Sequence, residues 1–194
     1  GNALDRILRE ILMADPTYGP VELMKVDLSD GFYRVDLHVG DVPKLGVVFP
    51  TEPGEEQLVA FPLVLPMGWT NSVGAFVAIG RQILSDFIPN PADIFIDDVI
   101  VKAVPTHLAD HTEISPGIRK FVYDHLSVLD KILGALKLSG LTVAGLKTSL
   151  CLDELTVVGY LCNRYGRTIG EDKVSKLTNW PTPTNLTDVR SFLA

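Results

Sequence analysis

Two acidic residues interrupt an otherwise apolar stretch, and this feature constrains the chain more than any other. In Ile94-Phe-Ile-Asp-Asp-Val-Ile-Val101, short apolar runs lie on both sides of Asp97 and Asp98. Two such runs meeting at polar residues predict a tight β-hairpin with both acids at its tip. Burial of a carboxylate beside so much apolar surface is costly unless the charge is paired or bound to a metal ion. The segment therefore predicts both a sheet and a charged site at its edge.

Asp27 is a third acid in a comparable position, near the end of the predicted strand 23–28. Carboxylates from neighbouring strands would form a hard oxygen site suited to Mg²⁺. Two such ions, about 3.5–4 Å apart, can activate a hydroxyl nucleophile and stabilise a leaving pyrophosphate. Taken alone, however, an Asp-Asp pair at a hairpin tip also fits a simple polar turn. Both interpretations stay open at this level.

Apolar periodicity predicts the remaining elements. The predicted helices cover 3–13, 71–87, 118–138, 173–180 and 188–194, and the predicted strands cover 23–28, 45–49, 58–65 and 156–162. Because these elements alternate irregularly and include hairpins, they favour an α+β fold over a doubly wound parallel sheet. We therefore expect an antiparallel sheet with helices packed on one face.

Composition excludes several classes of protein. A hydrophobic content of 46% fits a packed globular chain rather than a disordered one. No apolar run approaches the roughly 18 residues of a membrane span, so we expect no membrane partner. The two cysteines, Cys151 and Cys162, suit a reducing intracellular compartment, the cytoplasm or the nucleus. Because the sequence starts at Gly1 rather than Met, we expect a piece of a longer polypeptide.

Five segments, in order along the chain, resemble the polymerase motifs of reverse transcriptases from LTR retrotransposons and retroviruses. They are Lys25–Arg34 (motif A), Leu65–Ser72 with Phe76 (motif B), Phe95–Asp98 (motif C, with Phe in place of the usual Tyr), Gly140-Leu141 with Lys147 (motif D) and Val158–Gly166 (primer grip). Two further segments, Trp180–Pro183 and Val189–Leu193, resemble the region leading to the connection and RNase H domains. The pattern is most similar to gypsy-like LTR retrotransposons of the fungal type and covers nearly all of the chain from Glu22 onward.

This resemblance implies an RNA- and DNA-templated DNA polymerase. Residues 1–165 would form its palm with incomplete fingers, and 166–194 would begin the thumb or connection segment. The cofactors would be two Mg²⁺ ions, with Mn²⁺ as a substitute. The partners would be an RNA/DNA primer-template, deoxynucleoside triphosphates and the remainder of the Pol polyprotein: fingers, RNase H and, as a further candidate, integrase.

The resemblance also assigns roles to single residues. The metal ligands would be Asp27, Asp97 and Asp98. Lys147 would lie near the pyrophosphate as a general acid, although an ordinary surface lysine is an equal alternative. The nucleotide-binding residues would be Leu28 through its carbonyl, Ser29, Asp30 and Gly31 through backbone groups, Phe32 as a steric gate against ribonucleotides, and Met67 packing on the incoming nucleotide.

The net charge of −7 is an objection to nucleic-acid binding, because phosphate contacts need clustered Lys and Arg side chains. A palm collects carboxylates, and two bound metals would add about four positive charges. The basic residues that follow a duplex would come mainly from parts of the polymerase outside this sequence. We therefore expect weak nucleic-acid affinity from this piece alone.

Two alternatives to this function remain open, and one further candidate metal site has to be considered. The chain can be an inactive remnant or a domesticated retroelement fragment that acts as an interaction module. It can be an RNA-copying RNA polymerase, although an aromatic residue at Phe32 argues against a site that needs room for a 2′-hydroxyl. His107 and His111 have a spacing that could bind zinc on a helix, but the surrounding residues favour a solvated loop.

Overall fold

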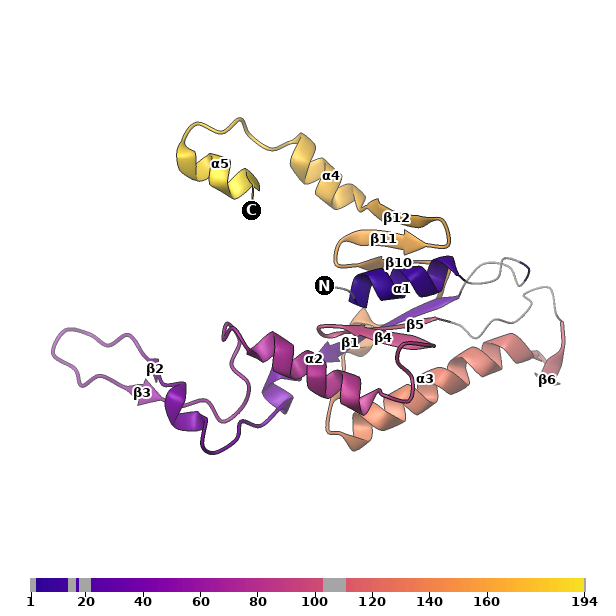
Figure 1. The fold of residues 1–194 in the computed structure, drawn as a ribbon, viewed down its shortest axis with the longest axis horizontal. Coiled ribbons are helices and arrows are strands. Elements are labelled where there is room, and N and C mark those ends of the chain that lie inside the picture. Colours follow the sequence, from indigo (N-terminus) through magenta and orange to yellow (C-terminus); the bar gives the residue numbers. More distant parts are fainter. Residues whose placement is uncertain (1–2, 14–16, 18–21, 103–110, 194) are drawn as a thin grey trace.

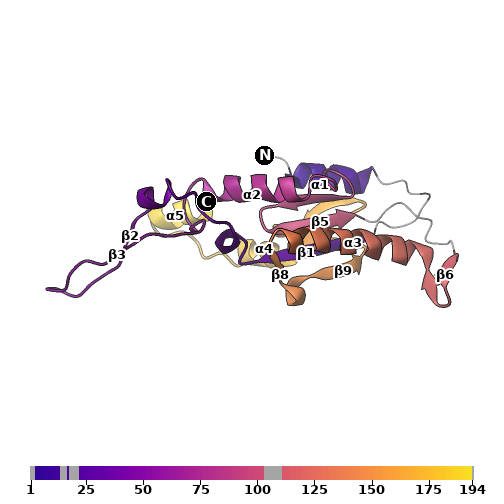
Figure 2. The same cartoon turned by 90° about the horizontal axis from the view of Figure 1, so that it is seen from below.

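A central antiparallel sheet organises the molecule. The computed structural model describes residues 3–13, 17, 22–102 and 111–193. Within these residues, β1 (Leu23–Ser29) is the middle of a five-stranded sheet of order β4-β5-β1-β8, and β9 also pairs with β1. Figure 1 labels β1, β4 and β5 of this sheet, and Figure 2 labels β8 and β9. The other strands are β4 (Ala92–Phe95), β5 (Asp98–Lys102), β8 (Thr142–Val143) and β9 (Ser149–Leu152). All of these pairings are antiparallel, as the sequence predicts.

One face of the sheet is apolar and carries two helices. Met24, Val26 and Leu28 alternate along β1 and belong to one buried cluster, because successive strand side chains point to opposite faces. The same cluster contains residues of α2 (Ser72–Ile83) and α3 (Lys120–Leu138), which lie on this side of the sheet. The predicted α+β fold class is confirmed.

The opposite face has its own core at one end only. Helix α1 (Ala3–Leu12) packs there against a small three-stranded sheet of β10 (Glu154–Val157), β11 (Tyr160–Asn163) and β12 (Gly166–Ile169). Leu23 and Ile100 of the central sheet belong to this second cluster. The acids Asp27 and Asp98 lie at the other end of the same two strands. The sequence predicts helices on one face of the sheet. Helix α1 and the three-stranded sheet cover part of the other face as well.

Several element boundaries differ from the sequence prediction. The single strand predicted for 156–162 is wrong, because the chain turns at Val158 and Gly159, both with positive φ, and forms the β10–β11 hairpin. Helix α2 ends at Ile83, short of the predicted 87. Residues 118–119 belong to β7 (Ile118–Arg119), which pairs with β6 (Glu113–Ser115). The predicted C-terminal helices appear as α4 (Glu171–Thr178) and α5 (Leu186–Leu193).

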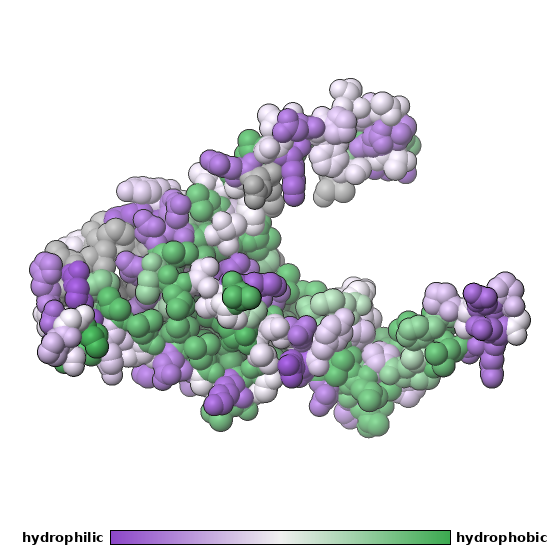
Figure 3. Space-filling model, turned by 180° about the vertical axis from the view of Figure 1, so that it is seen from behind, coloured by the Kyte–Doolittle hydropathy of each residue, from purple (hydrophilic) through white to green (hydrophobic). Residues whose placement is uncertain are grey.

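The part of the chain that connects β1 to α2 forms a thin arm that extends away from the sheet (Figures 1 and 2). Its strands β2 (Val47–Val48) and β3 (Val59–Ala60) are much shorter than predicted. Apolar side chains gather along the arm, and a hydrophilic tip closes it (Figure 3). Val47, Val48 and Val59 are 49%, 53% and 44% exposed, so these strands bury little apolar surface and the pairing stays short. No helix in the described ranges combines the length and apolar character that a membrane crossing requires.

Candidate active site

Asp27 and Asp98 lie directly opposite each other on neighbouring strands. The β1–β5 register pairs Asp27 with Asp98 and Lys25 with Ile100. Because residues two apart share a face, both carboxylates point away from the core beneath α2 and α3. In such a pair the Cβ atoms are about 4.5–5.5 Å apart. The two side chains are only 13% and 16% exposed, so two negative charges share a partly buried position.

Asp97 occupies the turn between β4 and β5, beside Asp98. Ile96, the other turn residue, has a φ of 56°, a rare value for a β-branched side chain. The N–H of Leu28 donates to the Asp97 carbonyl at 2.9 Å and fixes the turn to the residue that follows Asp27. The Asp97 side chain is exposed. Across the part of the chain that the structure describes, no three His, Cys, Asp or Glu side chains are arranged to hold a metal ion.

Two lysines supply positive charge to the carboxylates. Lys147 Nζ lies 3.5 Å from Asp27 Oδ2, and Lys25 Nζ lies 3.4 Å from Asp98 Oδ1. Lys147 ends the 3₁₀ helix Gly145–Lys147, whose preceding residue, Ala144, donates its N–H to the Asp27 carbonyl at 2.9 Å. The structure thus brings together the predicted Asp27, Asp98 and Lys147. Sequence reasoning missed Lys25, although its two-residue spacing from Asp27 places both on one face of a strand.

Burial raises the pKa of Asp98 above its ordinary value. The Lys25 ammonium opposes this shift, while the negative charges of Asp97 and Asp27 add to it. Desolvation disfavours the charged form of a carboxyl, and nearby like charges act in the same direction. A cation bound at this position would relieve both effects.

Apart from Met67, the residues predicted to bind a nucleotide occupy the end of β1 and the 3₁₀ helix that follows it. Asp30 has a left-handed backbone with a φ of 53° and precedes the 3₁₀ helix Gly31–Arg34. Ser29 Oγ donates to the Asp30 carboxylate at 3.2 Å. The Leu28 side chain is buried in the helix-covered core, so only its backbone faces the acidic end.

Phe32 is held against helix α2. Its ring centroid lies 4.9 Å from that of Phe76, with 31° between the ring planes. Gly31 lies so close to the same ring that an added Cβ would be 2.5 Å from Phe76 Cζ. The aromatic side chain after Gly31 therefore has a packed and defined position.

Met67 comes from a different element, the loop before α2. Its side chain is 63% exposed. The N–H of Leu65 donates to the Val35 carbonyl at 2.9 Å, and that of Leu37 donates to the Leu63 carbonyl at 2.8 Å. These two hydrogen bonds join the loop before α2 to the segment after Phe32. Met67 lies two residues beyond Leu65, and Val35 lies three residues beyond Phe32.

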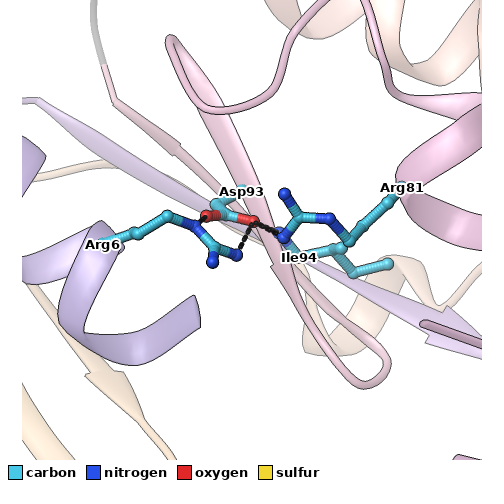
Figure 4. Close-up of polar contacts among 4 residues, drawn as sticks. All are labelled: Arg6, Arg81, Asp93 and Ile94. Carbon is cyan, nitrogen blue, oxygen red and sulfur yellow. Dashed lines mark hydrogen bonds and ion pairs between the residues drawn. The ribbon is translucent and has the colours of Figure 1, made fainter. Parts of the chain in front are cut away.

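A second charged cluster, which sequence reasoning also missed, lies on strand β4. Asp93 is buried, 2% exposed, and contacts Arg6 of α1 and Arg81 of α2 at 2.7 and 3.4 Å (Figure 4). Its Oδ1 also accepts the N–H of Ile94 at 2.8 Å. The sequence feature that could have revealed this cluster is an acid, Asp93, within the apolar run Ala92–Phe95. The cluster joins two helices to the strand that leads into the acidic turn.

The zinc alternative for His107 and His111, which the sequence disfavours, falls largely outside the part of the chain that the structure describes. His107 and Asp110 lie outside the described residues, and His111 is exposed. The chemistry of the acidic site, by contrast, fits a hard divalent cation. Asp27 and Asp98 present carboxylate oxygens from one face of two paired strands, and Asp97 adjoins them in the turn.

Comparison with known proteins adds the family. A family model described as reverse transcriptase (RNA-dependent DNA polymerase) matches residues 8–176. A Gag-Pol polyprotein of koala retrovirus is 29% identical over 174 residues, which make up 87% of this chain and 9% of that protein. A Pol polyprotein from transposon opus of Drosophila melanogaster is 25% identical over 169 residues, 87% of this chain and 15% of that protein. The chain thus spans a small part of these relatives.

A solved structure supports the fold. The foamy viral protease-reverse transcriptase in complex with an RNA/DNA hybrid superposes with a TM-score of 0.71 at 22% identity, over 100% of this chain and 22% of that one. At this identity the likeness concerns the fold. The family match covers most of the sequence, including all three acids and Lys147. The chain belongs to the reverse transcriptase family.

Proposed function

We propose that this chain is the palm of a polymerase that copies RNA or DNA into DNA by two-metal nucleotidyl transfer. The observation that carries the proposal is the placement of Asp27 opposite Asp98, with Asp97 next to it in a turn anchored to Leu28. Carboxylates at one edge, in a partly buried setting, are the donors that Mg²⁺ prefers. Family membership supports this use of the site.

In the proposed reaction, Asp27, Asp97 and Asp98 hold two Mg²⁺ or Mn²⁺ ions. When bound, the ions would activate the primer 3′-hydroxyl and neutralise charge on the triphosphate and the leaving pyrophosphate. Lys147, whose ammonium lies 3.5 Å from Asp27, would donate a proton to the pyrophosphate. The protein's main contribution would be positioning, since the β1–β5 register holds Asp27 opposite Asp98.

For the incoming nucleotide, we propose that backbone groups of Leu28, Ser29, Asp30 and Gly31 line the triphosphate pocket. Phe32, held by Phe76, would pack against the sugar and exclude a 2′-hydroxyl. Met67 would pack on the incoming nucleotide from the loop before α2.

We also propose partners for this chain and the type of element that encodes it. The partners would be a primer-template, deoxynucleoside triphosphates and the remaining Pol polyprotein with its fingers, RNase H and integrase. Residues 166–194 would begin the thumb or connection segment. The element would be gypsy-like and of fungal type, acting inside the cell in a reducing compartment.

Metal-dependent stabilisation tests the site. A ligand that binds only the folded state raises its stability by mass action, so Mn²⁺ should raise the Tm of the chain. Asp98→Asn should abolish most of this rise, whereas Asp86→Asn, which alters an exposed acid outside the site, should leave it intact. An equal Mn²⁺ shift in the wild type and in Asp98→Asn would contradict the proposed metal site.

The alternative, an inactive remnant acting as an interaction module, has one observation in its favour. The net charge of −7 opposes nucleic-acid binding by the chain alone. Primer extension by a longer polypeptide that adds the flanking Pol regions separates the two. Extension that depends on Asp97 supports the polymerase, and none under any metal condition supports the remnant.

A further inference from the structure

The two lysines at the acidic site are held very differently. Lys25 is 22% exposed and contacts Asp98, whereas Lys147 is 70% exposed and contacts Asp27. A largely exposed lysine keeps most of its rotamer freedom, and such an ion pair contributes little to stability. Lys25 is therefore the cation that stays with the carboxylates.

Strand β1 fixes the backbone position of Lys25. The flanking residues Met24 and Val26 are fully buried on the opposite face. Lys25 is paired on one side with Ile100 of β5 and on the other with Ser149 of β9. A change in the register of this strand would move apolar residues out of the core. The sheet therefore holds the Lys25 ammonium next to Asp98.

We infer that Lys25 is a built-in counter-ion of the acidic site, which holds Asp98 in place and weakens divalent-cation binding by competing for its carboxylate. The inference rests on the proposed metal site and goes beyond it, because it assigns a positioning residue that sets metal affinity. Without a cation, Asp27, Asp97 and Asp98 repel one another, and one ammonium relieves part of that repulsion. A divalent ion that binds Asp98 must displace Lys25 or remain close to its positive charge.

The test replaces Lys25 by Met, which keeps most of the apolar stem and removes the charge. The dissociation constant for Mn²⁺ is measured on the 194-residue chain by electron paramagnetic resonance of the free ion, with the Tm in EDTA and in Mn²⁺ as a second readout. We expect Lys25→Met to bind Mn²⁺ about tenfold more tightly, equivalent to about 1.4 kcal/mol. Its Tm in EDTA should fall, because the carboxylates lose their counter-ion.

Two variants serve as controls. Lys102 lies on the same face of the sheet, 11% exposed, and pairs with Glu10. It is four residues from Asp98 along β5, roughly 13 Å, and its charge is already balanced by the Glu10 carboxylate at 3.3 Å. Lys102→Met should therefore leave Mn²⁺ affinity unchanged within about twofold. Lys25→Arg keeps the charge and should also stay near the wild type, which separates charge from packing.

The outcomes distinguish the inference from the proposed function. If the wild type binds Mn²⁺ and Lys25→Met binds it equally or more weakly, the counter-ion role is wrong and the metal site stands. If neither protein binds Mn²⁺, the metal site fails and the inference is overturned with it. Should Lys25→Met not fold, Lys25→Gln provides a second uncharged variant with the same expected tightening.

Discussion

Nε of Arg6 lies 2.7 Å from Oδ2 of Asp93, and this ion pair joins helix α1 to the strand that leads into the acidic turn (Figure 4). Arg81 reaches the other carboxylate oxygen from α2 at 3.4 Å. Asp93 is 2% exposed, while the arginine side chains are 36% and 38% exposed. The carboxylate is thus the buried partner, and the cations reach it from the surface.

Removal of both arginines should strongly destabilise the fold. Arg6→Met with Arg81→Met leaves a buried carboxylate without a cation, which typically costs about 3–5 kcal/mol. The free energy of unfolding in urea measures the loss. Arg9→Met, an exposed position on the same helix, should change it by less than about 0.5 kcal/mol. A double variant as stable as Arg9→Met would show that Asp93 is not held by these arginines.

A methyl group at position 31 should disturb the aromatic pair. In Gly31→Ala the new Cβ would be 2.5 Å from Phe76 Cζ, and overpacking of this kind typically costs about 1–3 kcal/mol. Phe76→Leu should recover part of the loss in the double variant, as chemical denaturation can measure. Gly134→Ala in α3 is the matched control, because nothing lies within 4 Å of its added Cβ. That variant should be as stable as the wild type or slightly more stable.

Sugar selection tests the role of Phe32. In a longer, active polypeptide, Phe32→Val should improve the ratio of ribonucleotide to deoxynucleotide kcat/KM by roughly tenfold to a hundredfold, because a clash of about 1–3 kcal/mol is removed. Tyr33→Val alters the neighbouring ring, which is 50% exposed, and should leave the ratio unchanged. If Phe32 serves only as packing, both activities fall together and the ratio stays constant.

His125 should make the fold sensitive to acid. Its ring is 2% exposed, and neither ring nitrogen has a hydrogen-bond partner among the described residues. Burial lowers its pKa from 6.5 to about 4. The unfolded chain therefore takes up a proton near pH 6.5 that the fold accepts only near pH 4, so stability is lost as the pH falls through this interval.

The expected loss between pH 6.5 and 4 is roughly 3 kcal/mol, from linkage at about 1.4 kcal/mol per pKa unit. Unfolding curves across this range measure it for the wild type and for His125→Leu, which should lose this component. His111→Gln, at an exposed position, should keep the wild-type profile. Parallel profiles for the wild type and His125→Leu would contradict the assignment.

Much of the fold was readable from local pattern. The alternation in 23–28 and the two apolar runs around Asp97-Asp98 predicted β1, β4 and β5, because a strand with one buried face repeats every two residues. Helices α1 and α3 followed from their apolar spacing. The hairpin β10–β11 was not found, because Val158 and Gly159 lie within an otherwise continuous apolar stretch, and only the backbone reversal reveals the turn.

The sequence by itself determined which acids form the candidate site, since Asp27, Asp97 and Asp98 carry the motifs that resemble those of the family. Only the tertiary structure decided which charges meet them. Lys25 and Lys147 reach Asp98 and Asp27 through strand register and a distant 3₁₀ helix, and Asp93 meets Arg6 across 87 positions of sequence. The physical reason is that periodicity reports the environment of a residue along its own element, whereas an ion pair depends on how separate elements pack.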